Sequence, residues 1–258
     1  MQKRRLSADI EVSVIGLGTV KFGRNQGVKY PESFELPNDQ TILNLLSQAK
    51  EAGINLLDTA PAYGFSEERI GKLLTARHDW VIATKAGEEF LDGKSHFDFS
   101  QSAIEKSIHR SLKRLRTDYL DIVLIHSNGD DEKIIHEDEV FVTLNALKQA
   151  GKIRHIGMST KTIKGGLLSV DQSDVVMVTF NPIEQQDREV IQYAQQKQKG
   201  IFIKKAFASG HLSLLSEEDP IQNAMQFIFG EPGVTSVIVG TINPLHLKKN
   251  IQSVEAVL

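Results

Sequence analysis

The sequence predicts a (β/α)8 barrel, also called a TIM barrel, in one domain spanning residues 1–258. Three observations lead to this fold class. The 258 residues match the usual size of such a barrel, which is about 250 residues. Short runs rich in β-branched residues alternate with longer segments of helical period, as in a parallel sheet with a helix after each strand. Eight such runs, the number that closes a barrel, lie at residues 13–18, 54–58, 80–85, 119–126, 153–159, 175–181, 200–205 and 234–240.

Three segments between these runs carry an apolar stripe of helical period, which predicts helices that pack on a sheet. The stripes consist of Ile42, Leu45, Leu46 and Ala49, then Ile104, Ile108, Leu112 and Leu115, then Val140, Leu144 and Leu147. Gly53 and Gly151 each follow a stripe, where a left-handed residue commonly ends a helix. Ser66, followed by two glutamates, predicts the N-cap of a further helix. For residues 1–12 we expect a hairpin that closes the bottom of the barrel.

An open, doubly wound sheet with a dinucleotide-binding turn is the main alternative fold. Gly16, Gly18 and Gly23 follow the spacing G-x-G-x-x-x-x-G at the first predicted strand. Such a turn binds phosphates only when a helix begins directly after it. Here the next helical stripe begins near Asn38, so we reject this motif.

The composition narrows the class of protein. Hydrophobic residues make up 40% of the chain and charged residues 24%, as in a folded globular domain. A net charge of -3 leaves no excess of basic residues for a nucleic-acid partner. The absence of cysteine excludes disulfides, thiol nucleophiles and thiolate metal sites. Because neither a signal-peptide core nor an apolar stretch of about 18 residues occurs, we expect a cytoplasmic protein without a membrane partner.

Four ionisable residues follow the carboxyl ends of three neighbouring predicted strands. Asp58 ends the second strand, and Tyr63 lies in the loop after it. Lys85 ends the third strand and His126 ends the fourth. Each residue alone has an ordinary structural explanation, such as a turn, a cap or a solvated strand end. Because the active site of a (β/α)8 barrel forms at this end of the strands, their coincidence predicts a catalytic site.

These residue types suit the protonation of a carbonyl oxygen while a nucleophile attacks the carbonyl carbon. A free phenol has a pKa of about 10, and a nearby cation lowers it by stabilising the phenolate. We expect Lys85 to be that cation and Tyr63 to be the general acid. Asp58 keeps the ammonium group charged and in position. A neutral His126 donates a hydrogen bond to the substrate oxygen.

Four long segments resemble the aldo-keto reductase family, in the family's order and over almost the whole chain. They are GINLLDTAPAYGFSEERIGKLL, LKRLRTDYLDIVLIHS, GKIRHIGMST and VIVGTINPLHLKKN. The resemblance implies a (β/α)8 barrel that reversibly reduces aldehydes or ketones to alcohols. It also implies NADPH as the cofactor, bound without a Rossmann domain, with NAD as the alternative. The family's catalytic tetrad falls on Asp58, Tyr63, Lys85 and His126.

The resemblance also implies a larger set of cofactor contacts. The set is Gly18, Thr19, Val20, Asp58, Ser159, Thr160, Lys204, Lys205, Phe207, Ser209, Gly210, Gly240, Thr241, His246, Lys249 and Asn250. Ser159 matches a serine that binds the nicotinamide carboxamide, and Met177 stands where a second ligand, a glutamine, is common. KKAFASGHL replaces an aromatic-Ser-Pro-Leu segment, which places Lys204 where a ring usually stacks on the nicotinamide. We expect Lys204 or Lys205 to contact the pyrophosphate, and the positive groups near the site favour NADP.

Three other functions stay open at this point. A desolvated Lys85 also suits a Schiff-base lyase or aldolase, in which borohydride traps substrate on the lysine. A cofactor-sensing regulatory subunit is the second, because some family members are partners of channels. It would bind NADPH tightly without turning over aldehydes. A metal hydrolase is the third, but the histidines at 109, 126, 136 and 155 lack ligand spacing, so we expect no metal.

The expected partner is a small-molecule carbonyl compound, bound by a monomer or a weak homo-oligomer. Phe90, Phe97 and Phe99, in the loop after the third strand, are candidates for an apolar wall of its pocket, and the alternative is that they pack this loop onto the barrel. Trp80 is expected to pack within the fold.

Overall fold

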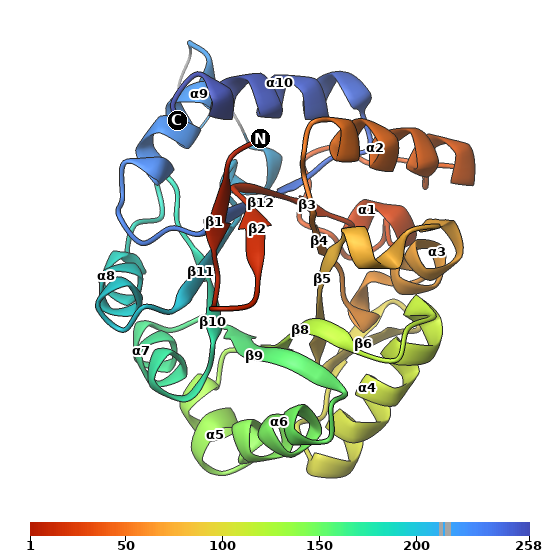
Figure 1. Cartoon of the computed structure of the whole chain (residues 1–258), viewed down its shortest axis with the longest axis vertical. Helices are drawn as coiled ribbons and strands as arrows, with labels where there is room; N and C mark the ends of the chain where they lie inside the picture. The colour runs from red at the N-terminus through yellow and green to blue at the C-terminus, as the bar shows by residue number, and fades with distance from the viewer. Residues whose placement is uncertain (212–213, 215–217) are drawn as a thin grey trace.

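Eight parallel strands form a closed barrel at the centre of the protein (Figure 1). The computed structural model describes residues 1–211, 214 and 218–258. Each predicted run overlaps one barrel strand, and the predicted (β/α)8 barrel is confirmed. The strands are β3 (Ile15–Gly18), β4 (Leu56–Asp58), β5 (Val81–Ala86), β8 (Leu120–His126), β9 (Ile153–Ser159), β10 (Val175–Thr179), β11 (Gly200–Lys204) and β12 (Ser236–Gly240).

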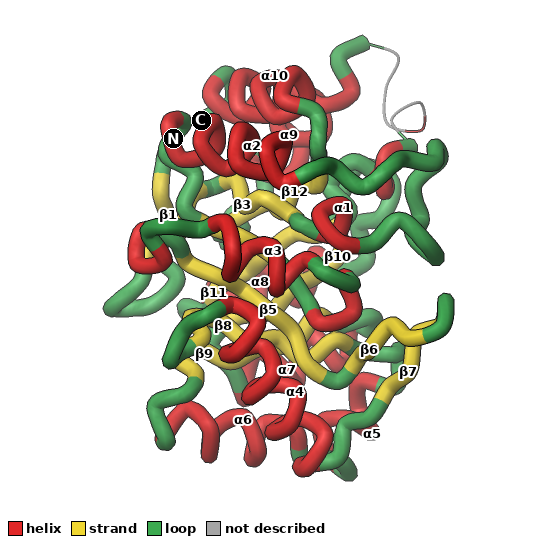
Figure 2. The backbone as a smooth tube through the Cα atoms, turned by 90° about the vertical axis from the view of Figure 1, so that its right-hand side faces the viewer, coloured by secondary structure: helices red, strands yellow, loops and turns green. Residues whose placement is uncertain are grey.

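Helices surround the barrel, so that the strands form an inner layer (Figures 1 and 2). The three predicted stripes are the buried faces of α2, α4 and α6, and Gly53 and Gly151 after α2 and α6 have positive φ, as predicted. None of the helices in the described residues is long and apolar enough to span a membrane. The helices are α1 (Val20–Gly23), α2 (Asp39–Glu51), α3 (Ser66–Leu73), α4 (Gln101–Leu115), α5 (Asp131–His136), α6 (Val140–Gln149), α7 (Ile163–Gln172), α8 (Arg188–Gln196), α9 (Pro220–Phe229) and α10 (Pro244–Glu255).

The prediction that Ser66 caps α3 is wrong. Phe65 occupies the cap position, and Ser66 is the first helical residue. The buried Ser66 hydroxyl instead donates to the carbonyl oxygen of Thr19 at 2.9 Å. It therefore ties α3 to the end of β3 and leaves the first amides of the helix uncapped by a side chain.

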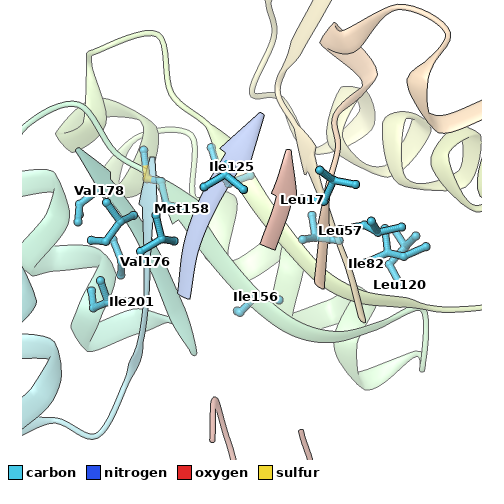
Figure 3. Close-up of a cluster of buried hydrophobic side chains, with 14 of the residues drawn as sticks. Leu17, Leu57, Ile82, Leu120, Ile125, Ile156, Met158, Val176, Val178 and Ile201 are labelled. Atoms are coloured by element: carbon cyan, nitrogen blue, oxygen red, sulfur yellow. The ribbon is translucent and has the colours of Figure 1, made fainter. Parts of the chain in front are cut away.

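Side chains alternate between two faces along each barrel strand and so form two apolar layers. The inward-facing layer fills the barrel and includes Leu56, Val81, Ala83, Ile122, Leu124, Val175, Met177 and Phe202. The outward-facing layer packs against the helices and includes Leu17, Leu57, Ile82, Ile125, Ile156, Met158, Val176, Val178 and Ile201 (Figure 3). Because Lys85 lies two residues after Ala83, the same alternation turns it toward the barrel interior.

An antiparallel hairpin of β1 (Lys3–Arg5) and β2 (Glu11–Ser13) covers one end of the barrel, as predicted (Figure 1). Leu6 and Val12 of this hairpin are buried in the inward-facing layer. Leu6 packs on Gly200 at the start of β11, where an added Cβ would lie 2.2 Å from Leu6 Cδ1. The hairpin therefore completes the core at the amino-terminal ends of the strands and leaves their carboxyl ends open.

We predict that Leu6→Ala lowers the free energy of unfolding by about 2–5 kcal/mol, because it opens a cavity in this layer. Leu245→Ala is the matched control. Leu245 is 73% exposed on α10, so its truncation should change stability by no more than about 0.5 kcal/mol. Urea unfolding followed by circular dichroism measures both variants. Equal stability of the two would show that the hairpin adds nothing to the core.

Candidate active site

One cavity of about 1110 Å³ lies at the open end of the barrel. The last inward-facing residue of every barrel strand lines it, and all of these except the two glycines are polar. They are Gly18, Asp58, Lys85, His126, Ser159, Thr179, Lys204 and Gly240. A polar ring therefore closes the apolar interior, and the predicted catalytic residues share this cavity with Tyr63.

Lys85 and Asp58 form a buried ion pair in the cavity. Lys85 Nζ lies 2.6 Å from Asp58 Oδ1, and the two side chains are 1% and 5% exposed. Lys85 Nζ also donates to the carbonyl oxygen of Thr59 at 2.9 Å. Thr19 Oγ1 donates to the carbonyl oxygen of Asp58 at 2.9 Å, which fixes the end of β4. The two oxygen acceptors offset the cost of burying the ammonium group.

Tyr63 stands beside both Lys85 and His126. It ends the short 3-10 helix η1 (Pro61–Tyr63), and Gly64 turns the chain after it. Gly64 has a φ of 62°, and a Cβ there would lie 2.2 Å from the carbonyl oxygen of Gly23. Lys85 Nζ lies 4.7 Å from the centroid of the Tyr63 ring. The Tyr63 and His126 rings meet edge to face with centroids 6.2 Å apart.

The pKa of Tyr63 is raised well above its ordinary value of 10.0, and the expectation of a lowered pKa is wrong. Burial is the largest cause, since it penalises the phenolate. The charges of Asp58 and Glu88 raise the pKa further, while the Arg24 guanidinium lowers it. The expectation fails because it left out the burial of the phenol and the effect of the Asp58 and Glu88 charges on it. Tyr63 is therefore a protonated phenol at neutral pH.

His126 has a carboxylate partner that the sequence analysis missed. Its Nδ1 lies 2.7 Å from Oε2 of Glu88, which is the distance of an ion pair, although the N–H direction falls outside hydrogen-bond geometry. Glu88 begins β6 (Glu88–Leu91), which pairs with β7 (Lys94–Phe97) in a hairpin. Ser95 Oγ donates to the other oxygen, Oε1, at 2.6 Å. A charged residue close after β5 was a usable signal, but an irregular loop was expected there, so its direction was not predicted.

Burial raises the pKa of Glu88, but its contact with His126, the hydrogen bond from Ser95 and the charge of Arg24 outweigh burial and lower the pKa to about 2. The pKa of His126 is lowered from its ordinary value of 6.5, with burial as the largest cause, although Glu88 raises it in part. The charges of Lys85 and Lys204 lower it again. Glu88 is thus a carboxylate at neutral pH, and it is the group that favours a positive charge on the His126 ring.

Lys204 reaches from β11 to the end of β9. Its Nζ donates to Ser159 Oγ at 2.8 Å and to the carbonyl oxygen of Thr160 at 2.7 Å. Burial, together with the charge of Lys205, lowers the pKa of Lys204 to about 7. The strand ends here, because Lys205 has a left-handed backbone with a φ of 56°, and its Nζ lies 3.7 Å from Glu184. Both lysines line the cavity.

Most of the other residues expected to bind the cofactor line the same cavity. They are Thr19, Val20, Thr160, Phe207, Ser209, Gly210, Thr241, His246 and Asn250. Lys249 differs from this expectation. It lies outside the lining, and its Nζ donates to Asp219, the cap of α9. Leu212, the last residue of KKAFASGHL, lies outside the described residues.

The cavity offers polar groups and backbone surface that fit a nicotinamide nucleotide. Thr160 Oγ1 is buried without a hydrogen-bond partner in the described part of the chain. Gly18 and Gly240 are neighbours in register on β3 and β12, so the wall there carries no side chain. A Cβ on Gly240 would lie 3.0 Å from the Tyr30 hydroxyl. An unpartnered hydroxyl suits a carboxamide, and bare backbone allows close approach of a large ligand.

The three candidate phenylalanines have different surroundings. Phe97 lines the cavity. Phe90 packs under the Arg24 guanidinium, with Arg24 Cζ 3.5 Å from its ring centroid, and Phe99 packs on Gly87. Trp80 is 4% exposed within the core, as expected. Across the residues that the structure describes, no group of three or more His, Asp or Glu side chains is arranged to hold a metal ion.

The fold and the site together define a barrel protein with a tyrosine, a histidine and a buried lysine–aspartate pair at its mouth. The family model described as "Aldo/keto reductase family" matches residues 14–223. The chain belongs to this family of oxidoreductases.

Solved structures and curated proteins of this kind cover nearly the whole chain. A putative aldo-keto reductase from Pseudomonas aeruginosa is 47% identical with a TM-score of 0.90, covering 99% of this chain and 95% of that one. The holo form of an aldo-keto reductase from Bacillus halodurans is 25% identical with a TM-score of 0.83, covering 99% and 91%. The uncharacterized oxidoreductase YqkF of Bacillus subtilis is 29% identical, covering 99% and 92%. The NADH-specific methylglyoxal reductase of Escherichia coli is 32% identical over 165 residues, which span 58% of this chain and 49% of that protein.

We predict that Asp58→Asn lowers the free energy of unfolding by about 3–5 kcal/mol, because it leaves the Lys85 ammonium buried without an opposite charge. The double variant Asp58→Asn, Lys85→Met removes that charge and should recover part of the loss. Urea unfolding measures both variants. If the single variant is as stable as the wild type, the ammonium group does not depend on the pair.

Proposed function

We propose that this protein reversibly reduces aldehydes or ketones to alcohols with NADPH, and that Tyr63 donates the proton. The observation that carries the proposal is the meeting of Tyr63, Lys85 and His126 in one cavity. When bound, the reduced nicotinamide supplies a hydride to the carbonyl carbon. The chain must then supply a proton for the carbonyl oxygen and charge to stabilise that oxygen as it becomes negative.

Tyr63 suits the first role because its phenol lines the cavity and is protonated at neutral pH. As the carbonyl oxygen gains negative charge, it becomes basic enough to take the phenolic proton. The Lys85 ammonium, held by Asp58, stabilises the phenolate that remains. Solvent then returns a proton to Tyr63, so the reaction consumes one carbonyl compound, one NADPH and one proton and yields one alcohol and one NADP+. His126, edge to face with Tyr63, suits the second role.

The cofactor would be held along the cavity wall. Ser159 and the unpartnered Thr160 hydroxyl are the proposed carboxamide ligands, and Lys204 or Lys205 is the proposed pyrophosphate contact. The adenosine end is assigned to Thr241, His246 and Asn250. We assign NADP because cationic groups are frequent in the lining, and NAD is the alternative, supported by the name of the Escherichia coli relative.

The geometry opposes a Schiff-base function at Lys85. An amine that attacks a carbonyl group must be neutral with a free lone pair. The Lys85 side chain is instead 1% exposed, and its Nζ donates to two oxygens, one of them in the Asp58 carboxylate. A cofactor-sensing subunit is less well supported, because all four residues of the proposed catalytic set lie in one cavity. Tight NADPH binding without turnover of any aldehyde would favour that function.

We predict that Tyr63→Phe lowers kcat for carbonyl reduction by at least about 100-fold, because the variant cannot give a proton. Loss of NADPH absorbance with a panel of aldehydes and ketones measures the rate. Tyr193→Phe is the matched control, since the Tyr193 hydroxyl donates to Asp171 on the outside of the barrel. Equal rates for Tyr63→Phe and wild type would remove Tyr63 as the acid.

We predict that removing a phosphate-binding charge weakens cofactor binding. Lys205→Met or Lys204→Met should raise the Kd for NADPH by about tenfold or more, the effect of one lost charged hydrogen bond. Lys249→Met is the control, because Lys249 pairs with Asp219 and does not line the cavity. Fluorescence titration with NADPH and NADH gives the affinities and the preference between the two. Unchanged affinity in both cavity variants would exclude these lysines as phosphate contacts.

A further inference from the structure

Glu88 is a buried carboxylate of the cavity wall to which the proposed reduction assigns no role. One of its oxygens faces His126 Nδ1 at 2.7 Å, and the other accepts a hydrogen bond from Ser95. These two contacts fix the Glu88 carboxylate beside the His126 ring. The question is what this neighbour does to the histidine.

A carboxylate at Nδ1 selects one tautomer of the neutral imidazole ring. Because the negative charge of Glu88 lies 2.7 Å from Nδ1, the neutral ring is most stable with its proton, and not its lone pair, on Nδ1. The lone pair is then on Nε2, and His126 is part of the cavity lining. The nitrogen that remains for a ligand of the cavity is thus an acceptor in the neutral ring. It becomes a donor only when the ring is an imidazolium.

We propose that Glu88 is a positioning residue that holds the Nδ1 proton of His126, so that His126 supports carbonyl reduction only as an imidazolium. This inference rests on the proposed reduction at the same site. Tyr63 still gives the proton, and the imidazolium N–H stabilises the negative charge that grows on the carbonyl oxygen. The reverse reaction passes through the same transition state, so the Tyr63 phenolate takes the proton of the alcohol beside the same imidazolium. The expectation that a neutral His126 donates to the substrate is thereby replaced.

The charge of the ring depends on groups from several elements. Burial and two neighbouring ammonium groups oppose the imidazolium, whereas Glu88 supports it. Removing the Glu88 charge therefore lowers the pKa of His126, and the imidazolium is then lost at a lower pH. The rate of carbonyl reduction should fall as the pH rises through the pKa of His126. In a variant without the Glu88 charge, this fall should occur at a lower pH than in the wild type. The groups that face the ring are Glu88 on β6, Lys85 on β5, Lys204 on β11 and Tyr63 on η1, with Arg24 facing Glu88.

Nitrogen-15 NMR of the histidine rings tests the tautomer without cofactor or turnover. His126→Gln identifies the His126 signals by their disappearance. In the wild type, at a pH above the pKa of His126, we expect the proton of the neutral ring on Nδ1. In Glu88→Met we expect that preference for Nδ1 to disappear. A wild-type His126 with its proton on Nε2 would overturn the proposal. Because the wild-type spectrum decides this, the test stands even if Glu88→Met does not fold.

The pH profile of kcat/KM for carbonyl reduction tests the consequence. We expect Glu88→Gln to move the high-pH limb to lower pH and to reduce kcat/KM at pH 7 by about tenfold or more, with partial recovery in Glu88→Asp. Glu89→Gln is the matched control, since Glu89 pairs with Arg110 and does not line the cavity. An unmoved limb in Glu88→Gln would overturn the proposal. Failure of the wild type to reduce any carbonyl compound would overturn the proposed function, while the NMR result would still decide the tautomer.

Discussion

The site depends on the alternation of side chains along eight strands that close on themselves. Once Val81 and Ala83 fill the barrel interior, Lys85 on the same strand must face the interior as well. A shift of one residue would turn the lysine toward the helices and leave an apolar residue at the mouth. The same strand period therefore sets both the packing of the apolar core and the position of the polar ring at the mouth of the barrel.

Burial at the mouth makes each charged group depend on a partner. Lys85 pairs with the Asp58 carboxylate, whereas in the described part of the chain Lys204 donates to two neutral acceptors, the Ser159 hydroxyl and the Thr160 carbonyl. The pKa of Lys204 is lowered to about 7, with burial as the largest cause. A neutral acceptor holds an ammonium group in place but does not offset the loss of water as well as a carboxylate does. The two lysines of the cavity thus differ in their partners, because Lys85 has an anionic partner and Lys204 has neutral ones.

The loop after β11 has an irregular backbone beside the cavity. Lys205, Ala208 and Ser209 all have left-handed backbones, which side chains other than glycine adopt at some cost. The loop meets the segment that follows β3, since a Cβ added to Gly210 would lie 3.2 Å from Pro31. Two irregular segments therefore meet beside the cavity. Their contact, together with Phe97 on the opposite hairpin, shapes the space that a ligand can use.

The sequence by itself determined the eight strands, the bottom hairpin and the strand-end positions of Asp58, Lys85 and His126, because strand period and apolar runs are local properties. Tertiary structure alone decided that Ser66 bonds Thr19, that Glu88 faces His126 and that Lys249 turns away from the cavity. Each of these contacts joins residues distant in the chain. The pKa of Tyr63 belongs with them, since it depends on burial and on the sum of charges from several elements. No local sequence pattern predicts that pKa, because the fold brings these elements together around Tyr63.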